Sequence, residues 1–476
     1  MMMNIFSPVA RLARFTPRVA CVTRFPAAAG LAAALLAAPP AQAGLPIQHW
    51  TQPGGAQVYL VESPSIPMLD VQLDFDAGTR RDPAAQAGLA SVTAGQASLG
   101  VRARDGEPAL DENALSEAWA DLGASFGADA GRDRMSFSLR TLTEPALLER
   151  AVQLAARQLG EPAFAPAPWQ RDRARISASL REALTQPATV AGQAFGAAVY
   201  GGHPYGNEMT PESLAAIEVG QMAAFYDATI RPCRAKVSLV GAVTRAQADT
   251  LVARLLARLP QGACAKLPAV GEVPPLAQAR EERIPFASAQ AHVLIGQPGV
   301  SRADPDYFPL TVGNYVLGGG GFVSRLTTEV RERRGLSYSV YSYFSPGMHA
   351  GAFVIGLQTR PDQADAAVGV VRNVLDKFVS EGPTEAELRA AKDNLVGGFA
   401  LRIDSNRKLL DNLANVAWYD LPLDYLDTWT QAVERVTLKE VRAAFARVLR
   451  PSRMVTVVVG AAAPAASAEK ALKAAP

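Results

Sequence analysis

The residues of this chain with the clearest chemical potential are Arg331 and Tyr338, which lie seven positions apart. A guanidinium holds a carbonyl oxygen through its N–H donors, and a phenol O–H donates to an oxygen that gains negative charge. The pair could therefore bind and polarise a carbonyl group. Both residues could instead serve only the fold, with Arg331 in a surface ion pair and Tyr338 packed in a sheet.

The pair follows a glycine-rich segment that would have to position it. Four consecutive glycines free the backbone there, namely Gly318, Gly319, Gly320 and Gly321, and Ser324-Arg325-Leu326 begins a predicted helix. Gly335 can end that helix in the left-handed conformation, and an alternating strand is predicted from Tyr338 to Phe344. A phosphate-binding loop is the alternative, but no Gly-Lys-Ser or Gly-Lys-Thr follows the glycines.

Sequence patterns recur at one offset along the chain. Arg231-Pro232 and the apolar run after it match Arg450-Pro451 and its own apolar run, 219 residues later. The turn that begins at Gly78 matches one that begins at Gly299, 221 residues later. Two matches in the same order predict a duplicated domain of about 220 residues.

Each copy mixes strands and helices without strict alternation, which favours an α+β fold of two homologous halves. Two capping boxes mark helix starts in the second copy, at Thr384 with Glu387 and at Thr437 with Glu440. The predicted boundaries are a signal peptide at 1–43, a first domain at 44–265, a proline-containing linker at 266–284, a second domain at 285–462 and a flexible tail at 463–476.

The first 43 residues predict export to the periplasm or the exterior. They carry four Arg and no acid, then an apolar run of Ala and Leu, then Ala41-Gln42-Ala43 as a cleavage site after Ala43. The alternative, a membrane anchor, is disfavoured because the apolar run is too short to span a bilayer. Without those four Arg, the 47 basic residues fall to 43 against 45 acidic ones. This near-neutral balance argues against nucleic acid and membrane surfaces as partners.

Two cysteines, Cys233 and Cys264, remain after such a cleavage. An even pair in an oxidising compartment predicts a disulfide. Cys233 precedes a predicted strand and Cys264 follows the next predicted helix, so antiparallel packing of the two elements would bring the sulfurs together. Two unreactive thiols are the alternative.

The duplicated α+β halves, the export signal and the glycine-rich segment together resemble the pitrilysin/insulinase family of zinc metallopeptidases, over residues 45–460. The resemblance implies two halves that form half of a clamshell around an extended peptide. It also implies that an Arg and a Tyr in the second half act on the substrate, here Arg331 and Tyr338, with the glycines contacting it. In the family, the first half of a catalytic subunit holds zinc on an H-x-x-E-H helix, with a distant Glu as the third ligand.

The zinc motif is missing from this chain. Ser91-Val92-Thr93-Ala94-Gly95 stands after Gly88-Leu89-Ala90, where the resemblance places H-x-x-E-H. Ser91 and Gly95 occupy the positions of the two zinc-binding His residues, and Ala94 occupies the position of the general-base Glu. The distant Glu falls near Ser179, with Glu182 one helical turn away. Zinc needs three nitrogen, sulfur or carboxylate ligands, so no zinc or other cofactor is expected on this chain.

The sequence therefore predicts a zinc-less subunit of a two-chain peptidase, inactive alone. A homologous partner with H-x-x-E-H would supply zinc in a heterodimer, and this chain would supply Arg331 and Tyr338 to an extended peptide. The alternative is a non-catalytic scaffold or peptide-binding protein of the same fold. A homodimer is also open, but it would carry no zinc.

Overall fold

The structure is a computed structural model that describes residues 46–460. The predicted signal peptide and the predicted tail lie outside these residues. Within them, no helix combines the length and the apolar character needed to cross a membrane.

The first half of the molecule, from β1 to α8, is built on a six-stranded sheet of order β1-β2-β6-β3-β5-β4. Neighbouring strands are antiparallel except β2 and β6, which are parallel. The strands are β1 (Gln48–Thr51), β2 (Gln57–Glu62), β3 (Met68–Phe75), β4 (Ser125–Ala130), β5 (Met135–Leu142) and β6 (Lys236–Gly241).

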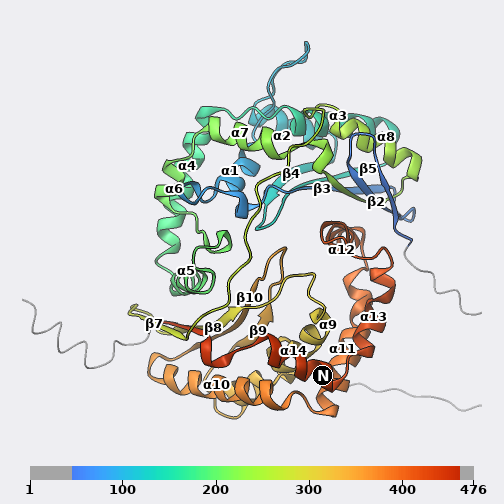
Figure 1. Cartoon of the computed structure of the whole chain (residues 1–476). Helices are drawn as coiled ribbons and strands as arrows, with labels where there is room; N and C mark the ends of the chain where they lie inside the picture. The colour runs from blue at the N-terminus through green and yellow to red at the C-terminus, as the bar shows by residue number, and fades with distance from the viewer. Residues whose placement is uncertain (1–45, 461–476) are drawn as a thin grey trace, which may run out of the picture. The chain divides into compact units, whose positions relative to one another are not determined.

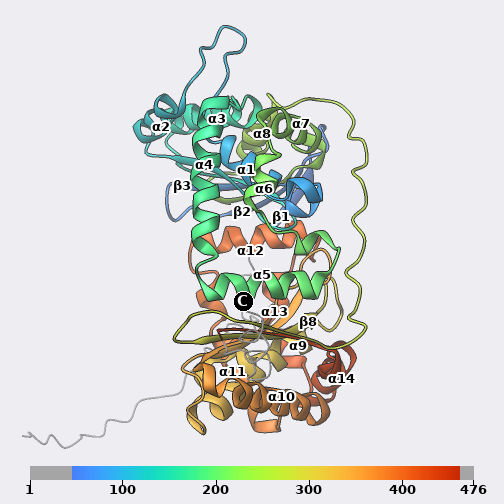
Figure 2. The same cartoon turned by 90° about the vertical axis from the view of Figure 1, so that its left-hand side faces the viewer.

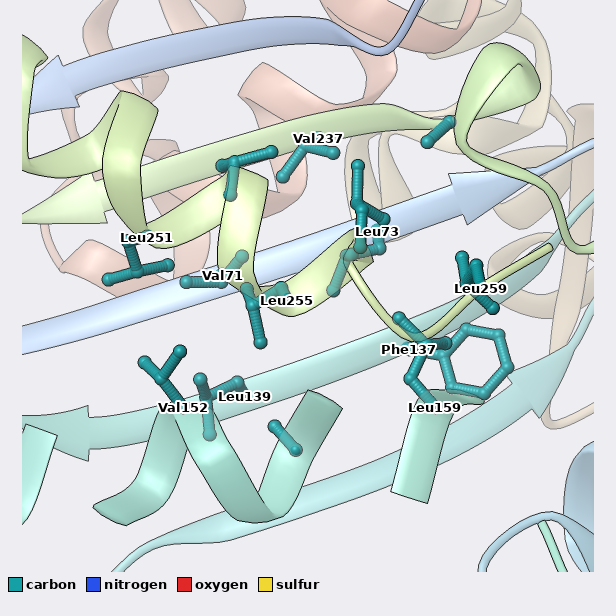
Figure 3. Packing of buried hydrophobic residues seen from close by; sticks show 14 of the residues in the cluster. Val71, Leu73, Phe137, Leu139, Val152, Leu159, Val237, Leu251, Leu255 and Leu259 are labelled. Carbon is teal, nitrogen blue, oxygen red and sulfur yellow. The ribbon is translucent and has the colours of Figure 1, made fainter. Parts of the chain in front are cut away.

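The helices of the same half are α1 (Leu89–Gln96), α2 (Glu112–Asp121), α3 (Pro145–Gly160), α4 (Pro166–Ala183), α5 (Pro187–Tyr200), α6 (Pro211–Ala215), α7 (Val219–Thr229) and α8 (Arg245–Leu256). Helices of this set, α3 and α8 among them, pack on one face of the sheet, whereas α5 does not. Alternate strand residues point to that face, as Val71 and Leu73 do on β3. They pack with Val152 of α3 and Leu255 of α8 in one buried cluster (Figure 3).

The second half, from β7 to β11, has a five-stranded sheet of order β7-β11-β8-β10-β9. Its strands are β7 (Arg280–Ile284), β8 (Ala291–Pro298), β9 (Val340–Phe344), β10 (Ala352–Thr359) and β11 (Val455–Val459). Its helices are α9 (Tyr307–Asn314), α10 (Ala364–Glu381), α11 (Glu385–Gly397), α12 (Asn406–Trp418), α13 (Tyr425–Arg435) and α14 (Leu438–Val448). Both predicted capping boxes are present, at the starts of α11 and α14.

The two sheets share one topology, so the predicted duplication is confirmed. The order β2-β6-β3-β5-β4 in the first half corresponds to β7-β11-β8-β10-β9 in the second, and each set has one parallel pair at the same place. The predicted linker needs one correction, because its last five residues form β7. Prolines and the lack of a clear period conceal this edge strand, which is held by parallel pairing with β11, far along the chain.

Each half completes its sheet with a helix from the other half (Figures 1 and 2). α5 belongs to the first half but packs on the second sheet, where Phe195 joins a buried cluster with the valines of β11. α12 belongs to the second half but packs on the first sheet, where Leu413 meets Tyr59 and Val61 of β2. Neither half can bury both faces of its sheet alone.

Cations of the first half hold the C-terminal end of α12. The Lys236 ammonium donates to the carbonyl oxygens of Ala417 and Trp418, at 2.8 and 3.3 Å. The Arg134 guanidinium donates to the Ala414 carbonyl at 3.2 Å. The last carbonyls of a helix have no partner within it and carry partial negative charge, so these donors both satisfy and stabilise that end.

A second polar contact joins the halves beside α5. The Tyr205 hydroxyl donates to the Asp133 carboxylate at 2.6 Å and accepts from the backbone N–H of His349 at 3.1 Å. Asp133 also accepts from the backbone N–H of Met348 at 3.0 Å. Tyr205 and Asp133 are buried, so this network fixes the loop after β9 against the first half.

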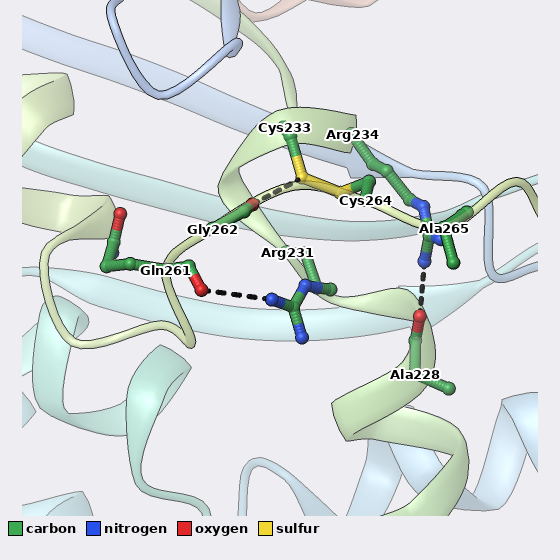
Figure 4. Close-up of a disulfide and its surroundings, with 8 residues drawn as sticks. All are labelled: Ala228, Arg231, Cys233, Arg234, Gln261, Gly262, Cys264 and Ala265. Atoms are coloured by element: carbon green, nitrogen blue, oxygen red, sulfur yellow. Dashed lines mark hydrogen bonds between the residues drawn. A yellow bond between two sulfur atoms is a disulfide. The ribbon is translucent and has the colours of Figure 1, made fainter.

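Cys233 and Cys264 are joined in a disulfide, with their Cα atoms 6.1 Å apart (Figure 4). Cys233 lies just before β6 and Cys264 lies after α8, the two positions that the sequence places at adjoining ends. The bridge closes a loop over 31 positions. Arg231 adds a hydrogen bond from its guanidinium to the carbonyl of Gln261, at 3.1 Å.

Replacing Lys236 with Met should weaken the attachment of α12. The variant keeps an apolar stem but leaves the two carbonyls without their charged donor, so the free energy of unfolding should fall by about 2 kcal/mol. Urea denaturation of the purified chain measures the change. Lys392 is the matched control, because its ammonium also donates to one carbonyl, that of Glu434 at 2.9 Å, but on an exposed surface. An equal loss of unfolding free energy in Lys236→Met and Lys392→Met would contradict the conclusion that Lys236 holds the end of α12.

Removing the disulfide should destabilise the chain measurably. The double variant Cys233→Ser, Cys264→Ser should lose about 3–4 kcal/mol of unfolding free energy, because a loop of this length is no longer closed in the unfolded state. Reduction of the natural chain should give the same loss. Alkylation of two free thiols in the unreduced, denatured protein would show instead that the bond does not form.

Candidate functional site

The glycine-rich turn is shaped by close packing against β9. After α9 the chain forms a π-helical stretch, Tyr315–Gly319, and a short 3-10 turn, Gly321–Val323. A Cβ on Gly318 would lie 2.6 Å from the backbone nitrogen of Ser342, and one on Gly320 would lie 2.6 Å from the Tyr315 carbonyl oxygen. Gly321 has a φ of +61°, which an L side chain rarely adopts. Gly318 is buried, so substrate contact remains open only for Gly319, Gly320 and Gly321.

Polar contacts anchor the chain that follows the turn. The Ser324 hydroxyl donates to the Gly321 carbonyl at 2.8 Å. Two nitrogens of the Arg325 guanidinium donate to the two carboxylate oxygens of Glu387, both at 2.7 Å. Burial alone would raise the pKa of Glu387, but hydrogen bonds from Arg325 and Thr384 outweigh it and lower the pKa to about 2. The pair therefore stays ionised at neutral pH.

Arg331 contacts two exposed aromatic rings. Its guanidinium carbon is 4.6 Å from the centre of the Tyr338 ring and 4.7 Å from the centre of the Phe322 ring. Tyr338 is 81% exposed and Phe322 is 68% exposed. Two cation–π contacts restrict the guanidinium while its N–H groups remain able to donate.

The chain geometry explains why the two residues meet. The helical stretch Thr327–Glu332 carries Arg331, and Gly335 turns back with a φ of +62° while its N–H donates to the Arg331 carbonyl at 2.9 Å. The Ser337 hydroxyl is bonded to the carbonyl of Gln358 on β10 at 2.7 Å, which fixes the next residue. Tyr338 then projects from the site where the chain enters the sheet.

The alternative structural roles are not found for this pair. Among residues 46–460, Arg331 has no ion-pair partner, whereas its neighbours Arg333 and Arg334 both pair with Glu329. Tyr338 does not pack in the sheet, because β9 begins only at Val340. The predicted strand therefore starts two residues too early, and the difference leaves the phenol ring exposed.

Phe322 is the residue that the sequence analysis missed. It follows the glycine run and could have been noticed as a large apolar side chain in a turn. Its stacking on Arg331 depends on the return of the chain at Gly335, which local patterns do not reveal. Local sequence patterns therefore do not indicate that Phe322 contacts Arg331.

The first half places α1 where the resemblance puts the zinc helix. The carboxylate of Asp82 holds its start, accepting from the backbone N–H of Gly88 at 2.8 Å and from that of Ala90 at 2.9 Å. Burial raises the pKa of Asp82 to about 6, although these backbone donors oppose the rise. The turn from Gly78 to Pro83 thus orients α1.

The residues of α1 do not fit a zinc ion. Ser91 is half-buried, Ala94 lies in the core, and Gly95 is exposed with nothing within 4 Å of a Cβ placed there. Zinc takes nitrogen, thiolate or carboxylate ligands, and none of these three residues offers one. Throughout the described part of the chain, no three His, Cys, Asp or Glu residues gather in a group suited to a metal.

α4 lies beside α1 and carries Ser179. Ile176 and Leu180 of α4 pack on the cluster that contains Leu89 and Val92 of α1. The acid of α4 that contacts α1 is Asp172, whose carboxylate accepts from the Gln96 amide at 2.9 Å. Ser179 and the exposed Glu182 have no such contact with α1. The structure therefore brings Arg331 and Tyr338 together in one half, and leaves Ser91, Ala94, Gly95 and Ser179 on two helices of the other.

Comparisons with known proteins agree with this arrangement. A family model described as "Insulinase (Peptidase family M16)" matches residues 57–212, and one described as "Peptidase M16 inactive domain" matches residues 216–395. An uncharacterized zinc protease of Streptomyces coelicolor is 26% identical over 419 residues, covering 85% of this chain and 88% of the relative. A protein of Helicobacter pylori named a non-peptidase homolog is 35% identical over 156 residues, which are 32% of this chain and 35% of that protein.

A solved structure gives the same answer at the level of the fold. The crystal structure of a peptidase M16 inactive domain from Pseudomonas fluorescens is 33% identical, with a TM-score of 0.82. The match covers 88% of this chain and 98% of that one. The two-sheet architecture, the turn before α1 and these matches have one explanation: the chain belongs to peptidase family M16, the insulinase or pitrilysin family.

Proposed function

We propose that this chain is the non-zinc subunit of a periplasmic two-chain zinc endopeptidase. It supplies Arg331 and Tyr338 to the substrate, and a homologous partner with H-x-x-E-H supplies the metal and the general base. The observation that carries the proposal is the contrast between the halves. The half-buried Arg331 contacts the exposed Tyr338 and has no ion pair among residues 46–460, while α1 holds no residue suited to zinc.

The chemistry of the pair suits peptide hydrolysis. Attack on a peptide carbonyl places negative charge on its oxygen, and the exposed Tyr338 hydroxyl donates to that oxygen as the charge develops. The Arg331 guanidinium, in contact with two rings, donates to a neighbouring backbone carbonyl and holds the peptide in place. The H-x-x-E-H residues of the partner would hold zinc, which would supply an activated water. Apart from the hydrogen bond donated by Tyr338, the roles proposed for this chain are to bind and orient the peptide.

The edge of the second sheet favours an extended peptide as substrate. β9 follows Tyr338 directly and is the last strand of its sheet, so one side of its backbone is without a strand partner. An extended peptide can pair with such an edge through main-chain hydrogen bonds. Gly319, Gly320 and Gly321 lie at the start of this surface and would allow close approach of the peptide backbone.

The heterodimer follows from the ligand count. Two copies of this chain would bring together two α1 helices, neither of which has a zinc ligand at the matched positions. Export rests on the signal-like residues 1–43 and is in keeping with the disulfide between Cys233 and Cys264.

A non-catalytic scaffold or peptide-binding role is the second candidate. The observation that favours it is the absence of zinc ligands on α1, together with the Helicobacter pylori relative that is named a non-peptidase homolog. In that role the exposed pair would bind peptide without supporting hydrolysis.

Replacing Tyr338 with Phe tests the catalytic role. The change removes one hydroxyl and keeps the ring that stacks on Arg331, so the complex should still assemble. Loss of one donor to a developing oxyanion should lower kcat about 100-fold. The measurement is turnover of a quenched fluorescent peptide by the complex purified from its native cells through a tag on this chain.

Arg333→Ala is the matched control for Arg331→Ala in the same assay. Both remove a guanidinium from one short segment, but Arg333 is paired with Glu329 whereas Arg331 contacts Phe322 and Tyr338. Arg331→Ala should lower activity at least tenfold, whereas the control should retain it. Full turnover in both Tyr338→Phe and Arg331→Ala would reject the catalytic role and leave the scaffold role.

A further inference from the structure

A cavity of about 370 Å³ lies between α5 and the edge of the second sheet, immediately beyond Tyr338. Part of its lining comes from Ser339, the residue after Tyr338, and from the following strand β9. The volume falls in the range of sites that enclose a ligand or a large side chain. The fold leaves this space open even though α5 covers the rest of the same sheet face.

Two tyrosines of the edge strand form one wall. Tyr341 and Tyr343 are alternate residues of β9, so they point to the same face. Their ring centres are 6.0 Å apart with an angle of 17° between the planes, and the side chains are 43% and 44% exposed. A Cβ on Gly356, which pairs with Tyr341, would collide with the Tyr341 ring. The glycine therefore lets the ring lie down against the sheet.

Small residues of α5 form the opposite wall. Phe195 fills the space above Gly296, where a Cβ would lie 2.9 Å from the ring, so the helix is firmly seated at that point. One turn earlier, a Cβ on Gly192 would meet nothing within 4 Å. Ala188 and Ala191 also line the cavity. These small residues leave open space on this face of α5.

The remaining surface combines apolar side chains on the floor with polar and charged side chains at the rim. Leu294 of β8 and Val354 of β10 line the cavity from the sheet. The charged residues of the lining, Arg132 and Glu208, are both exposed and opposite in sign. Arg132 is already stacked on the Tyr205 ring at 4.7 Å. Burial lowers the pKa of His292, which keeps its imidazole neutral at pH 7.

We propose that this cavity binds one bulky apolar side chain, aromatic or long aliphatic, of the extended peptide that Arg331 and Tyr338 hold. The inference rests on the proposed function, because the peptide is the ligand of that site. Ring faces on one side, methyl groups beneath and a glycine opposite give an aromatic side chain contacts on each of its surfaces. A charged side chain would lose hydration on the apolar floor and would meet charges of both signs, Arg132 and Glu208, at the rim.

The strand geometry sets where in the peptide this side chain stands. Tyr341 and Tyr343 lie three and five residues beyond Tyr338, which is about 10–17 Å along an extended strand. A peptide that runs beside β9 covers that distance in the same number of residues. The preferred apolar residue therefore stands three to five positions from the carbonyl that Tyr338 contacts.

The test uses the purified chain alone and measures binding rather than hydrolysis. The probes are fluorescein-labelled ten-residue peptides of Ser and Thr with one central Phe, Ala, Asp or Lys, followed by fluorescence anisotropy. The Phe peptide should bind at least tenfold more tightly than the other three. Gly192→Leu should abolish that preference, because its side chain occupies the cavity and replaces a helical glycine without straining the backbone.

Gly369→Leu is the matched control, since Gly369 is a helical glycine of α10 whose Cβ would also meet nothing within 4 Å. It should keep the tenfold preference. A second variant, Tyr341→Ala, removes one wall and should reduce the preference for Phe over Ala. Thermal unfolding of each variant confirms that it is folded before binding is measured.

The outcomes separate this inference from the proposed function. An unchanged Phe preference in Gly192→Leu, tighter binding of the Lys or Asp peptide, or no binding of the Phe peptide at millimolar concentration would each overturn the cavity assignment. Arg331→Ala should weaken all four peptides alike and leave their ratio intact. If the Phe preference holds while Tyr338→Phe leaves turnover of the complex unchanged, the cavity stands as a peptide site and the catalytic role falls.

Discussion

The exchange of α5 and α12 between the two halves is the constraint on which the rest of the structure depends. A sheet with one uncovered apolar face is unstable in water, and here the cover for each sheet comes from the other half. Lys236 ties the end of α12 to the first sheet, and Tyr205 ties the first half to the loop after β9. Local elements of both halves therefore hold their positions only when the whole chain is folded.

The same duplicated frame carries very different surfaces in its two copies. Residues 89–96 form α1 in the first half, and residues 307–314 form α9 at the equivalent place in the second. In the second half the helix runs on into the glycine-rich turn, which brings Phe322 over Arg331. In the first half α1 ends at Gln96, whose side chain is bound by Asp172. Two hydrogen-bond donors, Arg331 and Tyr338, therefore lie together in the second half, while α1 has small residues at Ser91, Ala94 and Gly95.

Much of the fold could be predicted, because short sequence patterns indicate it. The capping boxes at Thr384 and Thr437 and the left-handed turn at Gly335 depend on residues close together in the sequence. The duplication is visible because short local patterns recur at one offset. β7 could not be predicted, because its pairing partner β11 lies far away in the chain. The stacking of Phe322 on Arg331 and the late start of β9 depend on how the chain returns after a turn. Contacts of that kind are decided by tertiary packing, which short sequence windows do not contain.

The exchanged helices also bear on how a duplicated chain of this type could arise. A gene for one half alone would encode a sheet whose covering helix reaches away from it. Such a product buries its sheet by placing that helix on a second copy and receiving the copy's helix in return, which is a domain-swapped homodimer. Fusion of the two copies turns this association into an intramolecular event with a high effective concentration. Once fused, each copy is free to diverge, and one can lose a metal site while the other keeps its surface.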